Sequence, residues 1–276
     1  MSNNLIRRKL FVLHCIYNLD DADTTLNELS KLSQKLKNNF QIQIICINNN
    51  FRLDIDYLSV KYKNQVQFIN GSNSFFEFSA WKEGYLAIEA SVENNTLILF
   101  SNDTFYKNHP FKNCLDIVFL KFLLSSNLNF EKYICGIVQK INYEIVDNYI
   151  TTCFFIIDGR ASKVLLDNIT DMIIDVKLNE RPNKITENLV LGNDIEYVNF
   201  IQKWLTVKTK RSWYNAQKIN KSNRSLLLSK AMCIILEHSL SVNAQNKDIL
   251  VLDIFRATNM RIMRKFYSFR KEFKNG

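Results

Sequence analysis

Strand-like and helix-like apolar patterns alternate along the first 110 residues. Short apolar runs rich in β-branched residues are followed by longer stretches in which leucine and other apolar residues recur at helical spacing. Strands separated by helices of this length pair in parallel, so the pattern predicts an α/β fold on a doubly wound sheet. The expected strands are 10–16, 41–47, 66–69 and 96–100, and the expected helices are 24–36 and 77–90.

The second half predicts more helix. Strands are expected at 133–138 and 149–157, as neighbours in the same sheet, and helices at 113–128, 160–172, 194–206 and 225–239. No internal repeat or Pro- or Gly-rich linker interrupts the chain, so we interpret it as one continuous domain with a helical C-terminal part. Its segments are a first half (1–110), a second half (111–255) and a tail (256–276).

Composition narrows the choice of partner and compartment. The formal charge of +9 and the pI near 9.2 favour an anionic partner. The six cysteines form no C-x-x-C pair and lie mostly in apolar runs, as buried cysteines in a reducing compartment do. The chain shows no signal peptide and no run near the roughly 18 apolar residues that span a bilayer. We therefore expect a cytoplasmic protein, soluble or peripheral at the inner face of the membrane.

The tail has its own composition. It predicts a basic amphipathic helix, because apolar residues recur at roughly helical spacing among basic ones. Such a helix lies on an anionic membrane surface, or packs on the domain with a solvated basic side. Nucleic acid is not expected as a partner, since no nucleic-acid-binding motif accompanies the charge. The basic residues are Arg256, Arg261, Arg264, Lys265, Arg270, Lys271 and Lys274, against Glu272 alone.

Candidate chemistry lies where the predicted strands end. Ligands of such sheets bind outside the carboxyl ends of the strands, and these ends are rich in asparagine and aspartate here. The strand TLILF runs directly into Ser101-Asn102-Asp103-Thr104. A carboxylate there is placed to hold Mg²⁺ or Mn²⁺ on a diphosphate, which makes Asp103 the metal candidate, with Asn102 as a neutral oxygen donor. The alternative is an Asx-turn that caps the next element.

Three segments stand in order along the first half: FVLHCIYNLDDADTTLNELSKL with FQIQIICINNN, then INGSNSFFEFSAWKEGYLAI, then ILFSNDTF. Taken together, they resemble bacterial glycosyltransferases with the GT-A fold, the glycosyltransferase 2-like enzymes that build rhamnan, O-antigen and capsular polysaccharides. FVLHCIYNLDDADTTLNELSKL, followed by FQIQIICINNN, is similar to their opening strand, helix and second strand. INGSNSFFEFSAWKEGYLAI resembles their N-x-G-x-D-F-x-x-[WY]-x-x-G-L region, with Glu77 where Asp is more usual. ILFSNDTF takes the place of their D-x-D metal motif. The matching residues are Val12, His14, Tyr17, Asn73, Phe76, Glu77, Phe78, Trp81, Gly84, Asn102 and Asp103.

The resemblance implies a GT-A-like, mixed and mostly parallel sheet and an activity. The first half would bind a nucleotide-sugar donor, and the second half a glycan or lipid-linked glycan acceptor on a growing lipopolysaccharide O-antigen or capsule. Asp103 would hold the metal ion. The alternatives for His14, Phe78 and Trp81 are packed core positions. The residues implied in donor binding are His14, Tyr17, Asn18, Asn48, Asn49, Asn73, Glu77, Trp81, Lys82, Asn102 and Asp103.

An inverting transfer also needs a general base, whereas a retaining one does not. The resemblance puts this carboxylate roughly ninety residues beyond the metal motif, in LVLGNDIEYVNFIQKW. Asp194 is the first candidate, Glu196 the second, and Asp158 at another strand end competes with them. The alternative for Asp194 and Glu196 is a helix N-cap with a favourable charge in the first turn.

Two other classes of function stay open. A non-catalytic module, either a degenerate transferase or an assembly partner, is kept open by Asn102 in the place of a carboxylate. A nucleotidyltransferase would use a similar sheet, but its Gly/Arg/Lys-rich phosphate loop is missing. Metalloprotease, α/β-hydrolase, P-loop NTPase and dinucleotide-binding motifs do not occur in the sequence.

Overall fold

The computed structural model describes residues 7–109, 114–125, 132–167, 169, 195–209, 213 and 215–274. Its centre is a seven-stranded mixed sheet of order β3-β2-β1-β4-β6-β5-β7. β6 runs antiparallel to both of its neighbours, and the other pairs are parallel. The strands are β1 (Arg8–Ile16), β2 (Phe40–Asn48), β3 (Val66–Asn70), β4 (Leu97–Asn102), β5 (Tyr133–Lys140), β6 (Asn148–Asp158) and β7 (Leu250–Asp253).

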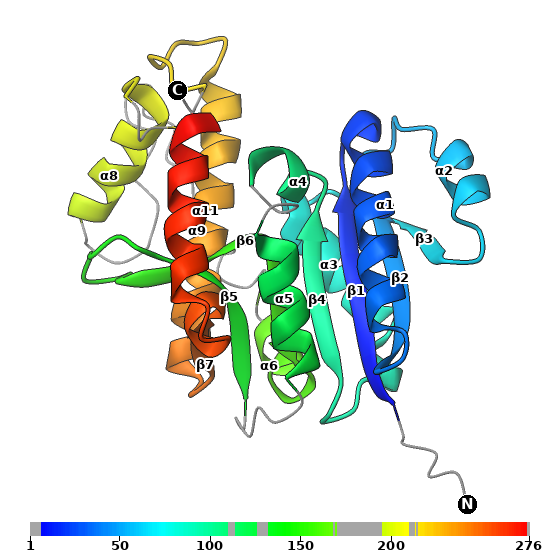
Figure 1. The fold of residues 1–276 in the computed structure, drawn as a ribbon. Coiled ribbons are helices and arrows are strands. Elements are labelled where there is room, and N and C mark those ends of the chain that lie inside the picture. Colours follow the sequence, from blue (N-terminus) through cyan, green and yellow to red (C-terminus); the bar gives the residue numbers. More distant parts are fainter. Residues whose placement is uncertain are drawn as a thin grey trace, which may run out of the picture.

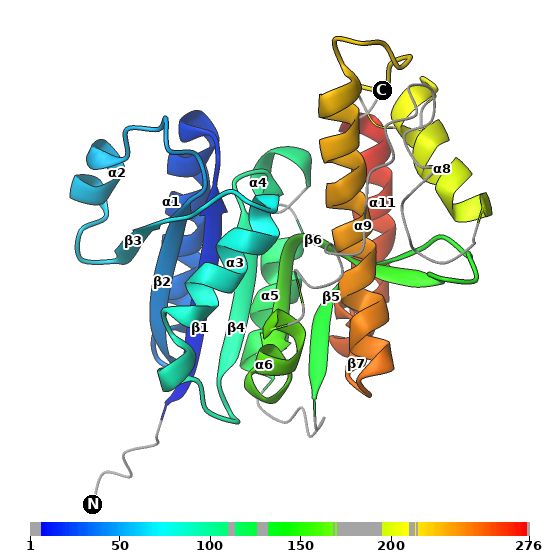
Figure 2. The ribbon, with the colours of Figure 1, turned by 180° about the vertical axis from the view of Figure 1, so that it is seen from behind.

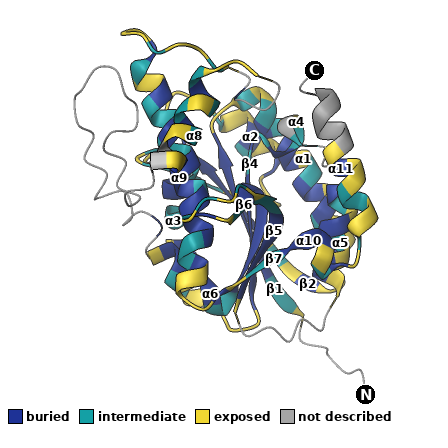
Figure 3. Cartoon of the chain, turned by 90° about the vertical axis from the view of Figure 1, so that its left-hand side faces the viewer, coloured by how far each residue is buried: buried dark blue, intermediate teal, exposed yellow. Residues whose placement is uncertain are grey.

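Helices cover both faces of this sheet (Figures 1 and 2). One face carries α1 (Leu19–Leu36), α4 (Phe105–Asn108), α5 (Leu115–Leu124), α10 (Ile254–Ala257) and α11 (Arg261–Lys274). The other carries α3 (Phe76–Leu86), α6 (Gly159–Asp167) and α9 (Arg224–Asn246). Figure 3 shows the buried sheet between these two layers. The remaining helices are α2 (Asp56–Lys61), η1 (Glu89–Ser91) and α8 (Ile195–Thr206).

The core follows from the alternation of side chains along the central strands. In β1, Leu10 and Val12 pack under α1, while Phe11 and Leu13 pack under α3. A strand that is covered on both faces must be apolar on both sides, which is why β1 and β4 are continuous apolar runs. The predicted α/β fold with a mixed, mostly parallel sheet flanked by helices is confirmed at this level.

β6 pairs with β4 almost to the end of β4 and then runs on past it. The two strands pair only from Phe154 to Asp158, and the pairing of β6 with β5 shifts between Gly136 and Val138. Beyond this shift the β5–β6 hairpin packs against α8 and α9 in a third apolar cluster. The sheet therefore divides at its centre, next to the end of β4.

α9 closes the side of this division. Among the described helices it is the one that is long and apolar enough to cross a bilayer, but half of its most apolar window is buried inside the molecule. It packs on β6 and β7 as a core helix does.

Candidate functional site

The polar strand ends meet at one edge of the sheet, as the parallel arrangement predicts. Ile16 of β1 pairs with Asn48 of β2, which in turn pairs with Asn70 of β3. Cys15 pairs with Asn102 on the other side of β1. The loops that follow these four strands are therefore neighbours in space. We call this the polar edge, made of residues 17–18, 48–50, 70–77 and 102–104.

Asp103 joins β4 to the start of α1. Its Oδ2 accepts hydrogen bonds from the backbone N–H groups of Tyr17 at 2.7 Å and Asn18 at 2.6 Å. Its own N–H donates to the carbonyl of Cys15 at 3.0 Å. Burial raises the pKa of this carboxyl, and the two backbone donors oppose that rise. Its Oδ1 accepts no hydrogen bond from the described residues, so one oxygen is left for a ligand.

Asn102 makes the Asx-turn that was the alternative interpretation of this segment. Its Oδ1 accepts from the backbone N–H of Thr104 at 3.2 Å and from the Thr104 hydroxyl at 2.8 Å. The side-chain oxygen that would bind a metal ion is thus already engaged.

The other asparagines mostly build the loops that carry the polar edge. Asn49 is buried; it accepts from the N–H of Asn73 at 2.9 Å and donates to the carbonyl of Phe76 at 2.8 Å. These bonds hold a loop in which Asn73 and Phe76 have φ values of 53° and 54°. Asn48 is buried and accepts from the N–H of Asn50.

Two residues at the rim stay accessible. Tyr17 is 56% exposed, and Asn18 is exposed while its side chain caps α1 by accepting from the N–H of Asp20. An aromatic ring and an amide at the end of β1 are suited to stack on a base or to hydrogen-bond to it.

His14 and Trp81 do not belong to the accessible surface. Both are fully buried: His14 bonds to Ser101 and Thr25 at 2.9 Å each, and Trp81 Nε1 donates to the carbonyl of Ser101 at 3.1 Å. This placement corrects the prediction that they contact the donor, because sealed side chains present no atom to a ligand at the edge. They join the strands and helices that form the edge.

Lys82 and the candidate bases also lie elsewhere. The Nζ of Lys82 donates to the carbonyl of Asp167, at the end of α6. Asp158 pairs with Leu97 at the start of β4, at the opposite edge of the sheet, and binds Arg160; this corrects its candidacy as the base. Glu196 is exposed on α8, which lies beyond α9 from β1–β4 (Figure 1). Asp194 lies outside the described residues.

Glu77 has partners that the sequence did not indicate. It lies in the first turn of α3, where burial raises its pKa; the positive charge of Lys230 opposes this rise, and the negative charge of Asp103 adds to it. Lys230 belongs to α9, as does Glu237, whose pKa responds to both Glu77 and Lys230. Charged residues of α9 therefore act electrostatically on Glu77 of the polar edge.

The only sequence signal for these partners is weak. Lys230, Cys233 and Glu237 are spaced three and four residues apart, which puts them on one face of an otherwise apolar helix. From sequence alone, nothing indicates which strand that face packs against.

A metal ion at the polar edge would need further coordinating atoms from the bound substrate. Among the described residues, no group of three or more His, Cys, Asp and Glu side chains is arranged to hold one. Mg²⁺ is often held by one or two carboxylates together with substrate phosphates. The Oδ1 of Asp103 fits a metal ion in that shared arrangement, with a diphosphate supplying other ligands.

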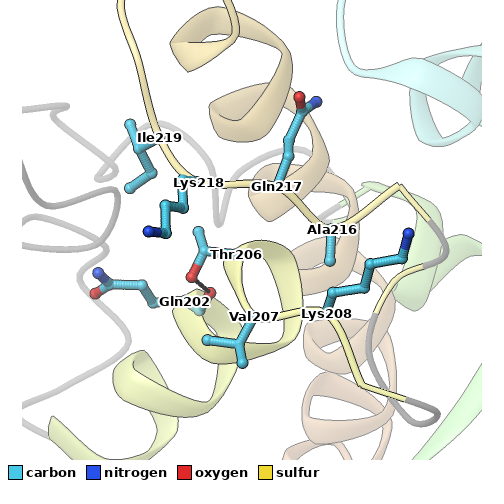
Figure 4. A pocket seen from close by; sticks show the side chains of 8 residues that line it. All are labelled: Gln202, Thr206, Val207, Lys208, Ala216, Gln217, Lys218 and Ile219. Atoms are coloured by element: carbon cyan, nitrogen blue, oxygen red, sulfur yellow. Dashed lines mark hydrogen bonds between the residues drawn. The ribbon is translucent and has the colours of Figure 1, made fainter.

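A separate pocket of about 520 Å³ lies at the end of α8 (Figure 4). It contains no residue of the polar edge, and the lysines and glutamines that line it come from α8 and from a loop before α9. We assign it no role in the site. Its lining residues are Gln202, Thr206, Val207, Lys208, Ala216, Gln217, Lys218 and Ile219.

The fold and the polar edge define an α/β protein with a candidate site outside the carboxyl ends of its strands. No protein-family model and no curated protein matches the chain. Among solved structures, the chain is similar to one described as the cryo-EM structure of Euglena gracilis mitochondrial ATP synthase, OSCP/F1/c-ring, rotational state 3. That match has 10% identity, covers 97% of this chain and 68% of the other, and has a TM-score of 0.24, so no argument is drawn from it.

Proposed function

We propose that this chain is a glycosyltransferase that moves a sugar from a nucleotide-sugar donor to a growing surface glycan. The observation that carries the proposal is the end of β4, where Asp103 is held by two backbone N–H groups with one oxygen left over. Four strand ends meet beside it, and the charge of Lys230 on α9 acts on Glu77 at the start of α3. The ordered resemblance of three segments to GT-A-fold glycosyltransferases supports the same function, and so does the mixed, mostly parallel sheet.

Each part of the polar edge has a task in this proposal. Tyr17 and Asn18 lie at the rim, where they bind the base and ribose of the donor. The Oδ1 of Asp103 would hold Mg²⁺ or Mn²⁺ on the diphosphate, and this ion would supply positive charge against the departing nucleotide. Asn49 fixes the loop that leads into Glu77, and so sets where the first turn of α3 meets the donor.

One observation favours a second candidate, a non-catalytic module. Asp103 and Asn102 both use a side-chain oxygen to bond to the backbone, as purely structural residues do. A degenerate transferase or an assembly module would keep these bonds while it lost the chemistry.

A thermal-shift screen against UDP-, GDP-, dTDP- and CMP-sugars, each with and without Mn²⁺, separates these two candidates. A ligand that binds only the folded protein stabilises it by about 2.7 kcal/mol at a hundredfold excess over its Kd. We expect one nucleotide class to raise the melting temperature, more so with Mn²⁺, and Asp103→Asn to lose most of that shift. Asparagine still accepts from Tyr17 and Asn18, so the variant without ligand should melt near the wild type.

Asp248→Asn is the matched control. Asp248 is exposed between α9 and β7, with a φ of 54° that asparagine tolerates equally well. This variant should keep the full ligand shift. If none of the nucleotide sugars stabilises the wild type, the glycosyltransferase proposal fails and the non-catalytic module is preferred.

We also propose that the protein works at the cytoplasmic face of an anionic membrane, with α11 as its contact. Ile262 and Phe266 are 72% and 54% exposed, next to the exposed cations Arg261 and Lys265. Apolar and basic groups side by side suit the boundary between headgroups and acyl chains. A lipid-linked acceptor would be within reach from such a position.

A further inference from the structure

The division of the sheet leaves backbone donors of β6 without strand partners. At this point α9 takes over: the N–H of Ile150 donates to the Ser241 hydroxyl at 2.9 Å, and the N–H of Thr152 donates to Glu237 Oε1 at 2.7 Å. The Thr152 hydroxyl donates to the same oxygen at 3.2 Å. Glu237 is thereby fixed beside the end of β4.

This structural task does not require a charge. Ser241, one turn along α9, meets the same need with a neutral hydroxyl. Glu237 uses only Oε1 for it, and Oε2 accepts no hydrogen bond from the part of the chain that the structure describes. The residue is also partly accessible, whereas Ser241 is fully buried. A carboxylate with a fixed oxygen and a free one therefore remains to be explained.

The groups around Glu237 come from both halves of the chain. Lys230 lies two turns earlier on the same face of α9, and the charges of Lys230 and of Glu77 on α3 both act on Glu237. The charge of Asp103 acts in turn on Glu77. Glu237 therefore lies within electrostatic range of groups from both halves of the chain. The other titratable groups that respond to the charge of Glu237 are Tyr149, Cys233 and Tyr267.

This environment suits a proton acceptor. Burial is the largest cause that raises the pKa of Glu237, and Glu77 adds to it, while Thr152 and Lys230 hold the rise back. A carboxylate with a raised pKa is a stronger base.

We infer that Glu237 is the general base of the proposed transfer, an inference that rests on the proposed function. Its Oε2 takes the proton of the acceptor hydroxyl while the hydroxyl oxygen forms its bond to the anomeric carbon of the donor sugar. The bond between that carbon and the diphosphate oxygen breaks, and its electron pair leaves with the nucleoside diphosphate. The step is an inverting displacement, balanced by the protonated Glu237, which releases its proton to water afterwards.

Glu237→Gln tests the inference because the amide oxygen still accepts from Thr152. The probe is the nucleotide sugar that stabilises the wild type, with Mn²⁺, and the readout is release of free nucleoside diphosphate with water as acceptor. We expect E237Q to keep the thermal shift but to lose turnover by about a hundredfold or more, the usual contribution of a general base. Ser241→Ala, which removes the side-chain acceptor of the Ile150 N–H on β6, should keep wild-type turnover.

The outcomes separate the inference from the function on which it rests. Wild-type turnover in E237Q overturns the role of Glu237 and leaves the glycosyltransferase proposal intact. A wild type that binds no nucleotide sugar, or binds one without turnover, overturns both. If E237Q has a lower melting temperature than the wild type, Glu237→Asp provides a second test, because it retains a carboxylate. Both variants are then assayed at a temperature where both are folded. Equal turnover of E237D and E237Q overturns the inference.

Discussion

The hydrogen bonds of His14 fix the protonation of a buried imidazole beneath the polar edge. The Thr25 hydroxyl donates to a backbone carbonyl of α1, so it accepts from Nε2–H of His14, and Nδ1 then accepts from Ser101. A second proton on the ring would place a positive charge in this fully buried position. Burial accordingly lowers the pKa of His14 to about 3.

This lowered pKa predicts a pH-dependent contribution to stability. Between the ordinary value of about 6.5 and the folded value of about 3, only the unfolded chain binds the proton, so stability falls as the pH falls. Relative to His14→Gln, the wild type should lose about 1.4 kcal/mol of unfolding free energy per pH unit across this window. Urea unfolding of both proteins at several pH values measures the difference, and a difference that stays constant would contradict the assignment.

At the scale of residues, the sequence showed which polar residues gather at the sheet edge better than it showed what each side chain binds. It selected the asparagines and Asp103 because they follow apolar strands, and they do gather at one edge. Whether an Asn side chain faces a ligand or its own backbone depends on loop geometry, which a sequence does not display. Asn48, Asn49 and Asn102 bond to backbone groups, whereas Tyr17 and Asn18 remain exposed.

At the scale of elements, long periodic segments were predicted well. β1, β2 and β4 lie where their apolar patterns indicated, because a strand buried on both faces leaves a strong signal. α1 ends at Leu36 as expected from its amphipathic pattern, but it begins at Leu19, five residues before the expected start. β7 and α2 were missed, since elements of four and six residues are too short to show a period. The helix expected to reach residue 90 ends at Leu86, and η1 follows it.

The close contact between α3 and β2 leads to a prediction about the packing of α3, the helix that carries Glu77. A Cβ on Gly84 would lie 2.9 Å from Cδ1 of Ile47, so Gly84→Ala overpacks this contact. Overpacking costs about 1 to 3 kcal/mol, and the better helix propensity of alanine offsets about 1 kcal/mol of that. We therefore expect a net loss of up to about 2 kcal/mol in urea unfolding.

Ile47→Val supplies the control because valine lacks Cδ1. In the I47V background the cost of Gly84→Ala should shrink or change sign, and the double-mutant cycle should give a coupling of about 0.5 kcal/mol or more. Strictly additive effects would show that α3 does not rest on Ile47 in this way.

Glu237 and Lys230 show that predicting a helix correctly does not predict which distant residues it approaches. Both lie in a helix predicted correctly, yet they are more than 120 residues from Asp103 along the chain. They lie near the polar edge because β6 runs on past the end of β4, where α9 packs against it. That arrangement depends on sheet order and on a register shift, neither of which a hydrophobic pattern reports.

At the scale of the whole molecule, the two halves share one sheet, and the candidate site lies where they diverge. The first half contributes Asp103 and Glu77, and the second contributes Lys230 and Glu237. A donor held by strand ends on one side and an acceptor approached from α9 on the other would meet over the end of β4. This division of labour follows from the topology.

The tail forms the helix α11, which packs on the domain by one face and exposes the other to solvent. Tyr267 is buried and bonds to His109 at 2.8 Å, and Arg264 pairs with Asp253 and donates to the carbonyl of Val138. These contacts fix the rotation of α11. Of the two interpretations of the tail, packing on the domain is therefore confirmed, and the same packing turns Ile262 and Phe266 outward.

This fixed orientation predicts which residues of α11 would contact the bilayer in the proposed membrane binding. Ile262→Ser with Phe266→Ser removes exposed apolar groups without touching Tyr267 or Arg264, so the fold should be kept. Burial of two such side chains contributes about 1.5 kcal/mol or more each, so the double variant should bind vesicles of phosphatidylglycerol and phosphatidylcholine at least about tenfold more weakly in co-sedimentation. Binding of the wild type should also weaken with salt and on pure phosphatidylcholine, because Arg261 and Lys265 act through charge.

Phe51→Ser with Val60→Ser is the matched control. These two residues are 86% and 75% exposed, at and near α2, on the opposite side of the molecule from α11 (Figure 1). The control removes the same kind and amount of exposed apolar surface, so any general effect of hydrophobicity on sedimentation would appear in both double variants. Equal loss of vesicle binding in both double variants would contradict a specific membrane contact by α11. Wild-type vesicle binding in both would mean that the membrane contact lies elsewhere. Loss confined to the α11 variant would identify the face that the protein turns to the bilayer, and with it the side from which a lipid-linked acceptor approaches.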